Sequence, residues 1–135
     1  MDKERLSSYF FMVEIDGIQS ARFLECDGLE METTVYEIEE GGLNTTTHKF
    51  LGHSRYPNLV LKKGVSNNNM LEKWYRNIIN GNFERRTVSV ILMDSSREEI
   101  KRWNLFRAFP CRWKGPSLNA QDNSFPIEMI EIVHD

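Results

Sequence analysis

A long half-polar segment that ends at two adjacent glycines most constrains how this chain can fold. Residues 30–39 alternate as a strand does, yet both faces carry polar side chains. Gly41 and Gly42 interrupt the pattern, and residues 43–50 have β propensity but little apolar content to anchor them. We expect these residues to be the return arm of a long hairpin that runs into a loop over residues 52–58. An isolated hairpin is marginal in water, so we expect the arm to pack on a neighbour.

The rest of the chain is predicted to be mainly β with one helix. Strand patterns cover residues 9–15, 20–26, 59–63, 85–93, 98–106, 111–113 and 125–133, with an Asp16-Gly17 hairpin turn between the first two. The helix is predicted by one apolar stripe, formed by Leu71, Trp74, Tyr75, Ile78 and Ile79, and by Gly81 just past its end. We expect a single domain over residues 1–135, an antiparallel β-sandwich or small barrel with this helix on its flank.

Composition excludes several classes of protein. A chain of 135 residues, 40% of them hydrophobic, fits one domain with one core, and two cysteines are too few for a disulfide scaffold. No apolar run approaches the ~20 residues of a membrane span, so we predict no membrane anchor. The first residues are mixed in charge without a following apolar region. We therefore expect cytoplasmic synthesis without a signal peptide.

The net charge of −3 conceals a strong segregation of charge along the chain. Residues 23–48 hold seven acids and no Lys or Arg, residues 49–114 hold fourteen Lys or Arg against five acids, and residues 115–135 hold four acids and no base. This layout indicates either a nucleic-acid face or two complementary faces that meet in self-assembly. The overall acidity argues against the first, and we predict no sequence-specific nucleic-acid binding.

A search for catalytic and metal-binding patterns finds none. The three histidines, His48, His53 and His134, lack zinc-site spacing, and no nucleophile elbow, phosphate loop or dinucleotide fingerprint is present. Glu37 and Glu39 share one face of a strand, which favours a solvated or interface surface over paired catalytic carboxylates. We therefore predict no enzyme and no catalytic, cofactor-binding or metal-binding residues.

Several segments in order resemble the contractile phage-tail tube protein family, found in phage tails and extracellular contractile injection systems. These are YFFMVEIDG, FLECDGLEMETTVYEIEEGGLN, LVLKKGV before LEKWY, RRTVSVILMD, RWNLFRAFPCRWKGPSLNA and FPIEMIEIVH, which together span about Tyr9 to His134. Phe109 before Pro110 departs from the Trp found in many members, although both are large aromatics. The resemblance rests on the ordered set of segments, which covers nearly the whole chain.

The resemblance implies a structural subunit that forms hexameric rings, whose inner sheets join into one continuous β-barrel around a cargo channel. Stacked rings form a rigid tube inside a sheath, and contraction drives the tube through a target envelope. Implied partners are copies of the chain itself, a sheath protein, baseplate and spike proteins, and cargo in the lumen. The assembled structure that the resemblance implies is a phage tail or a phage tail-like particle, either released from the cell or associated with a membrane or cell.

Two groups of residues are assigned to contacts between proteins on these grounds. The arm between subunits or rings is predicted to include Glu39, Gly41, Gly42, Leu43, Asn44, Thr45 and His48. The sheath-facing side of the helix is predicted to carry Glu72, Lys73, Arg76 and Asn77. Two alternatives remain open, a tube-initiating or baseplate paralogue of the same fold and a small β-barrel binding module.

Overall fold

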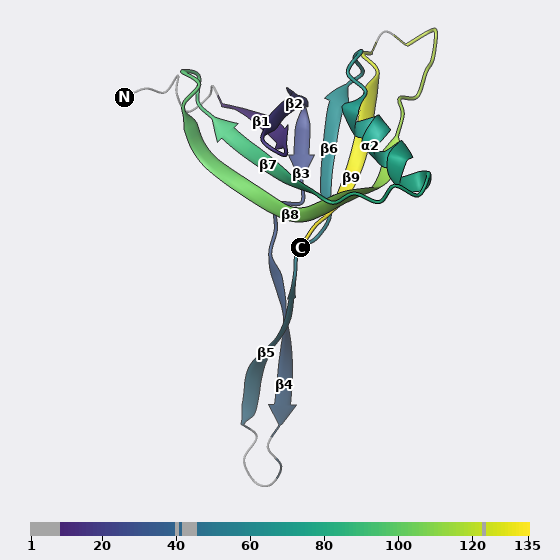
Figure 1. Cartoon of the computed structure of the whole chain (residues 1–135). Helices are drawn as coiled ribbons and strands as arrows, with labels where there is room; N and C mark the ends of the chain where they lie inside the picture. The colour runs from purple at the N-terminus through teal and green to yellow at the C-terminus, as the bar shows by residue number, and fades with distance from the viewer. Residues whose placement is uncertain (1–8, 40, 42–45, 123) are drawn as a thin grey trace.

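A curved antiparallel sheet with a projecting hairpin forms the chain in the computed structural model, which describes residues 9–39, 41, 46–122 and 124–135 (Figure 1). The sheet has the strand order β2-β1-β7-β8-β9-β6-β3. Its strands are β1 (Phe10–Ile15), β2 (Ile18–Arg22), β3 (Glu25–Asp27), β6 (Leu59–Gly64), β7 (Arg86–Met93), β8 (Glu99–Lys114) and β9 (Ile127–Val133). A separate hairpin comprises β4 (Glu32–Glu39) and β5 (Thr47–Arg55), and the described part contains one helix, α2 (Met70–Ile79). The prediction of a mainly antiparallel β fold with one helix is confirmed.

The long strand β8 joins the two halves of the sheet. Its first part, as far as Ala108, pairs with β7, and residues 109–114 pair with β9. The register shifts where the two parts meet, and Arg107 there has a positive φ of 53°. Such a bulge bends a strand and increases its twist. Figure 1 shows β8 curving beneath the rest of the sheet as a result.

The prediction of two separate strands over residues 98–106 and 111–113 is wrong, because Pro110 does not end β8. Proline lacks the N–H that a central ladder needs, but it is tolerated at bulges and on edges. The register of β8 against β9 shifts between Pro110 and Arg112, and Pro110 is fully buried there. The strand therefore continues through the proline to Lys114.

One hydrophobic core holds both halves of the sheet together. Val13, Val88 and Leu105 come from the first half, and Leu59, Leu61, Ile130 and Ile132 come from the second. All seven side chains are buried and belong to one cluster with Leu71 and Trp74 of α2. Burial of such aliphatic side chains stabilises the fold by roughly 1.5–3 kcal/mol each. The two halves and the helix thus form one body.

The predicted strand over residues 20–26 is in fact two strands at opposite ends of the sheet. Asp16 and Gly17, both with positive φ, close the two-residue turn that pairs β1 with β2, as predicted. After β2 the chain crosses at buried Phe23, and β3 pairs with β6 instead. Residues 20–26 therefore do not form one strand, because β2 pairs with β1 whereas β3 pairs with β6.

Three other boundaries differ from the sequence-based expectation. β5 continues to Arg55, where a loop over residues 52–58 was expected, because Arg55 and Ser54 still pair with β4. β9 starts at Ile127 rather than at residue 125. Ile79, predicted in the buried stripe of the helix, is 66% exposed, because α2 ends there and the core is reached by its earlier residues. Gly81 follows the helix with a φ of 98°, as expected of a residue past the C-cap.

Candidate assembly surfaces

The β4–β5 hairpin projects away from the body of the molecule, and every residue of β4 is exposed (Figure 1). The two strands pair from Glu32 with Arg55 to Glu39 with Thr47. At the base, the Nη2 and Nε atoms of Arg55 both lie 2.8 Å from Oε2 of Glu32. The described residues place no layer against this hairpin, so it gains little from burial and its stability depends on what packs against it.

The two faces of the hairpin differ in chemistry. By the register, Tyr36 faces Phe50 across the strands and Ile38 faces His48. This face, which we call the apolar face of the hairpin, leaves Tyr36, Ile38 and Phe50 each more than half exposed. A side chain at Gly52 would collide with the ring of Tyr36, so the glycine lets that ring lie over the strand. The opposite face carries Val35 and Leu51 together with Glu37, Glu39 and Lys49.

The predicted arm residues fall on this hairpin where the structure describes them. Glu39 is the last residue of β4 and His48 the second of β5, and both are exposed. Gly41 is also exposed. Gly42, Leu43, Asn44 and Thr45 lie outside the described residues. Sequence reasoning missed the apolar face, whose signal is the alternation of Tyr36 with Ile38 opposite Phe50.

The predicted outer side of α2 is only partly open to solvent. Lys73 and Arg76 are exposed, whereas Glu72 and Asn77 are half-buried. Glu72 accepts a hydrogen bond and ion pair from Arg76 at 2.8 Å, one helical turn away. The charge most available to a partner on this side is therefore that of Lys73.

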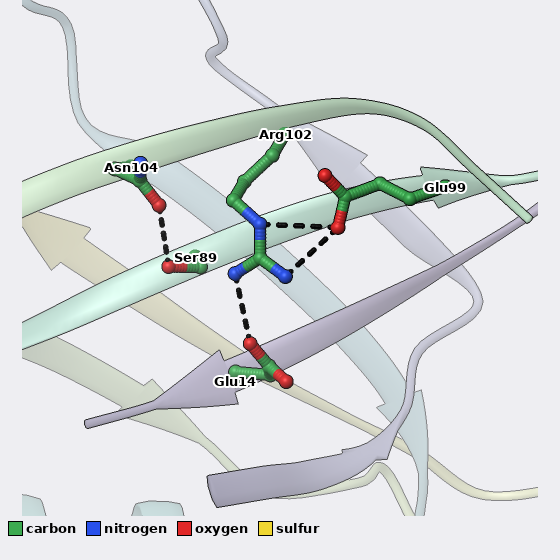
Figure 2. A network of polar contacts seen from close by, with 5 residues as sticks. All are labelled: Glu14, Ser89, Glu99, Arg102 and Asn104. Atoms are coloured by element: carbon green, nitrogen blue, oxygen red, sulfur yellow. Dashed lines mark hydrogen bonds and ion pairs between the residues drawn. The ribbon is translucent and has the colours of Figure 1, made fainter. Parts of the chain in front are cut away.

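A polar network lies on the face of the sheet that is turned away from the core, across β1, β7 and β8. Figure 2 shows Arg102 between two carboxylates. Its Nη1 lies 2.9 Å from Oε1 of Glu14, and its Nη2 lies 2.8 Å from Oε1 of Glu99. The hydrogen bond to Glu99, which is the larger cause, and the hydrogen bond to Glu14 raise the pKa of Arg102. Beside it, the hydroxyl of Ser89 and Oδ1 of Asn104 are 2.7 Å apart (Figure 2). Sequence reasoning assigned these residues no role; the network ties three strands together.

The corresponding face of the other half of the sheet is also polar. The register places Glu25, Lys62, Met129 and Lys114 in one row across β3, β6, β9 and β8, and Asp27, Val60, Glu131 and Arg112 in the next. An open groove of about 880 Å³ runs between this face and the segment before β9, where Leu118 and Phe125 are exposed.

The described residues contain no cluster of three His, Cys, Asp or Glu side chains that could hold a metal ion. Cys26 and Cys111 are free thiols, and burial, reinforced by the charge of Asp27, raises the pKa of Cys26 to about 11. A thiol that holds its proton this tightly is a poor nucleophile. No helix in the described ranges is long and apolar enough to cross a membrane.

Residues 7–135 match a family model described as T4-like virus tail tube protein gp19. No curated protein sequence matches the chain at a significant level. Among solved structures, the chain resembles one from the extended sheath–tube complex of the PVC extracellular contractile injection system, at 25% identity and a TM-score of 0.84. That match covers 93% of this chain and 84% of the other.

Two further structures extend the comparison. A chain from the tube-terminating cap of the anti-feeding prophage matches at 25% identity and a TM-score of 0.83, over 100% of this chain and 87% of that one. Hcp1 from Flavobacterium johnsoniae shares the fold at 14% identity and a TM-score of 0.59, over 93% and 89% of the two chains.

Proposed function

The chain belongs to the T4-like virus tail tube protein family, and from this premise we propose that it is the repeating inner-tube subunit of a contractile injection machine. As a member of that family it is a structural tube subunit. Its work in this proposal is mechanical, and it catalyses no reaction. Copies form hexameric rings, the rings stack, and the tube is driven forward when a surrounding sheath contracts.

The observation that carries the proposal is the hairpin with its uncovered apolar face. Tyr36, Ile38 and Phe50 are all more than half exposed on a segment that projects from the body. Contiguous exposed apolar surface of this kind marks an interaction site. A second copy of the chain is the proposed occupant. The arm, from Glu39 through the glycines to His48, lies in the contact between subunits or rings.

The proposed partners outside the tube are a sheath and a baseplate. One similar solved structure comes from a sheath–tube complex, and others come from a tube-terminating cap and a baseplate. The exposed side of α2, with Lys73 and Arg76, is the proposed sheath contact. Contacts of mixed charge are weak and sensitive to salt, which suits a sheath that must release the tube. Cargo passes through the lumen of the assembled particle.

A second candidate role is that of a tube-ending or tube-starting paralogue. It is favoured by the likeness to the chain from a tube-terminating cap, whose TM-score of 0.83 nearly equals the 0.84 of the sheath–tube complex. The two roles differ in stoichiometry. A repeating subunit is present in many copies along each tube, whereas a terminal paralogue forms one ring per particle.

Electron microscopy of the purified chain tests the proposal directly. We expect concentrated protein to form rings or stacked tubes with an open channel, and the assembled fraction to rise with concentration. A paralogue would give single rings that do not stack. A single monomeric species by light scattering over a hundredfold range of concentration, with no particles in the microscope, would contradict both roles.

A further inference from the structure

The β4–β5 hairpin is joined to the body by two short linkers. Residues 28–31 lead into β4 and residues 56–58 lead from β5 to β6, and neither range belongs to a strand. Among the described residues, the two strands of the hairpin pack on each other, and neither makes an extensive contact with a strand or helix of the body. The direction in which the hairpin points is therefore decided at its base.

The two linkers cross in close contact where they meet the body. Gly28 has a φ of 104°, and a Cβ atom at this position would collide with the carbonyl oxygen of Asn58, so the crossing requires glycine. The side-chain amide of Asn58 also donates a hydrogen bond to Oε2 of Glu131 on β9 at 2.8 Å. The crossing is thus fixed to the second half of the sheet.

Beyond the crossing, the linkers stand over a hollow instead of packing on the sheet. The hollow has a volume of about 340 Å³ and lies between the linkers, residues 102–106 of β8 and the two residues that follow β9. The linker side chains of Leu29 and Met31 border it and are 37% and 82% exposed. A segment with so little packing has little to hold its angle, so specific contacts must do so.

The two residues that follow β9 make contacts on both sides of this hollow. Asp135 is anchored to β8, because its backbone N–H donates to the carbonyl of Phe106 at 3.0 Å and its Oδ2 lies 2.8 Å from Nε of Arg107. His134 contacts the hairpin side, where its ring centroid lies 5.5 Å from that of Tyr56, the residue directly after β5. Figure 1 shows the C-terminal end of the chain at the point where the hairpin leaves the body.

The anchor point on β8 is itself held in a fixed conformation. Arg107 lies where β8 bends and has a φ of 53°, which is unfavourable for a residue with a side chain. Its carbonyl accepts a hydrogen bond from Nη1 of Arg85 at 3.1 Å. Cζ of Arg85 lies over the rings of Phe83 and Phe109, 5.3 and 4.7 Å from their centres. An unfavourable backbone conformation persists only where such contacts hold it, so the bend gives Asp135 a fixed attachment.

These contacts contribute little to the stability of the body. The side chains of Arg107 and Asp135 are 66% and 61% exposed, and an ion pair so exposed adds little to the free energy of unfolding. Nε2 of His134 is buried and has no hydrogen-bond partner among the described residues, so packing, and not this nitrogen, holds the ring against Tyr56. What the contacts do fix is the angle between the end of β5 and the body.

We propose that His134 and Asp135 position the hairpin. Asp135 is fastened to the bend of β8, the ring of His134 holds Tyr56, and the β4–β5 hairpin is thereby presented in one direction before a second copy arrives. This inference rests on the proposed function, in which the apolar face of the hairpin meets another copy, and it names the residues that present that face. Such preorganisation removes the cost of ordering the hairpin during association.

Distances between two spin labels in the unassembled chain test this positioning. Labels attached through Thr47→Cys on β5 and Ser95→Cys in the β7–β8 turn, both exposed, report the angle of the hairpin against the body. Cys26→Ala and Cys111→Ser remove the native thiols first. The labelled chain should give one narrow distance distribution. His134→Ala should broaden it about twofold or more, because the linkers then lack their contact, and His134→Phe, which keeps an aromatic ring, should restore it.

Assembly of the unlabelled chains gives a second measurement. A hairpin that points in the competent direction for about a tenth of the time weakens each contact about tenfold, because the apparent affinity scales with the competent fraction. The assembled fraction of His134→Ala and of Asp135→Ala should therefore fall at a concentration at which the wild type is half assembled. Glu99→Gln is the matched control, since it breaks an ion pair of the same 2.8 Å length with Arg102 and should leave the label distances unchanged.

A further variant keeps the test independent of any one substitution. Tyr56→Ala removes the other ring of the contact and should broaden the distances as His134→Ala does, so the role can be judged even if one of the two folds poorly. Thermal unfolding identifies such a variant.

The outcomes separate the positioning role from the proposed function. Distances as narrow in His134→Ala and Tyr56→Ala as in the wild type, or not restored by His134→Phe, would overturn the role. Broadened distances with undiminished assembly would also overturn it, because the direction of the hairpin would then not matter to the contact. A wild-type chain that never assembles contradicts the proposed function, whereas the label distances, measured in single subunits, still decide whether His134 and Asp135 set that direction.

Discussion

The ammonium group of Lys63 lies 2.8 Å from Oε1 of Glu128, and both side chains are almost withdrawn from solvent, at 5% and 13% exposure. Lys63 is the last residue before Gly64 on β6 and pairs across the sheet with Glu128 of β9. Its Nζ also donates to the carbonyl of Asn68 at 3.1 Å. The pair thus fastens the segment that leads into α2 to the second half of the sheet.

Breaking this pair on one side should be costly. Glu128→Gln leaves a buried ammonium group without its counter-charge, and removal of one partner of a buried ion pair costs about 3–5 kcal/mol. Urea unfolding of the unassembled chain should show that loss. The control is Glu32→Gln, which breaks the exposed pair with Arg55 and should cost less than about 1 kcal/mol. Equal effects of the two substitutions would contradict the structure around Lys63.

Trp74 should be the most costly truncation in the helix. It is 2% exposed, and its indole N–H donates to the carbonyl of Glu84 at 3.0 Å. Trp74→Ala should lower the free energy of unfolding by about 3–5 kcal/mol, as large aromatic truncations in cores do. Ile79→Ala is the matched control, since Ile79 is 66% exposed and should change stability by less than about 0.5 kcal/mol. An unchanged melting temperature for Trp74→Ala would mean that this ring is not part of the core.

The sequence predicts those features that local patterns determine. The turn at Asp16 and Gly17 and the position of Trp74 in the core follow from a dipeptide and a periodicity, and both are confirmed. The continuation of β8 through Pro110 could not be predicted, because it depends on a bulge against a strand distant in sequence. The burial of Lys63 could not be predicted either, because its partner Glu128 is 65 residues away (128 minus 63).

In the candidate assembly surfaces, too, local patterns predict the strands, whereas contacts between residues distant in sequence determine the rest. Alternation indicated that residues 30–39 form a strand with mixed faces, and β4 is such a strand. Which side of the hairpin is apolar depends on its register with β5, where Tyr36 meets Phe50. The acidic strand β3 and the basic end of β8 lie at opposite ends of one half of the sheet only because of the strand order. The charge segregation along the chain was visible, but its placement was not.

The apolar face of the hairpin should be needed for assembly and not for folding. Tyr36→Ser with Phe50→Ser removes its two aromatic rings, which pair across the strands and are each 51% exposed. We expect a melting temperature close to that of the wild type and few or no tubes by microscopy. Glu37→Ser with Lys49→Ser changes the opposite face at the neighbouring register position and should assemble more completely. Normal tubes from the Tyr36/Phe50 variant would exclude this face from the contact.

Stability should fall at alkaline pH through Cys26. Burial, reinforced by the charge of Asp27, raises the pKa of its thiol to about 11, against about 8.5 in an unfolded chain. The native state therefore holds the proton more tightly, and the resulting stability is complete below about pH 8.5 and is lost as pH rises towards 11. The urea midpoint of the wild type should drop between pH 8 and pH 10. Cys26→Ala should show a smaller drop, and an identical drop would mean that the half-buried Cys26 thiol does not contribute.

The exposed side of α2 should matter to the sheath and not to the tube. Lys73 makes no ion pair with any described residue, and Arg76 is exposed beside Glu72. Lys73→Glu with Arg76→Glu reverses the charge of this side and removes one helical ion pair, which is worth about 0.3–0.5 kcal/mol and leaves the core untouched. Tubes should therefore form normally, while sheath polymerised on preformed tubes should be shorter, because a weak contact of mixed charge depends on each of its charges. The measurement is sheath length per tube by microscopy at moderate salt, with Ile79→Ala as a control that changes the end of the same helix without altering charge. Equal sheath loading would remove α2 from the sheath contact, and loss of tubes would place it between subunits instead.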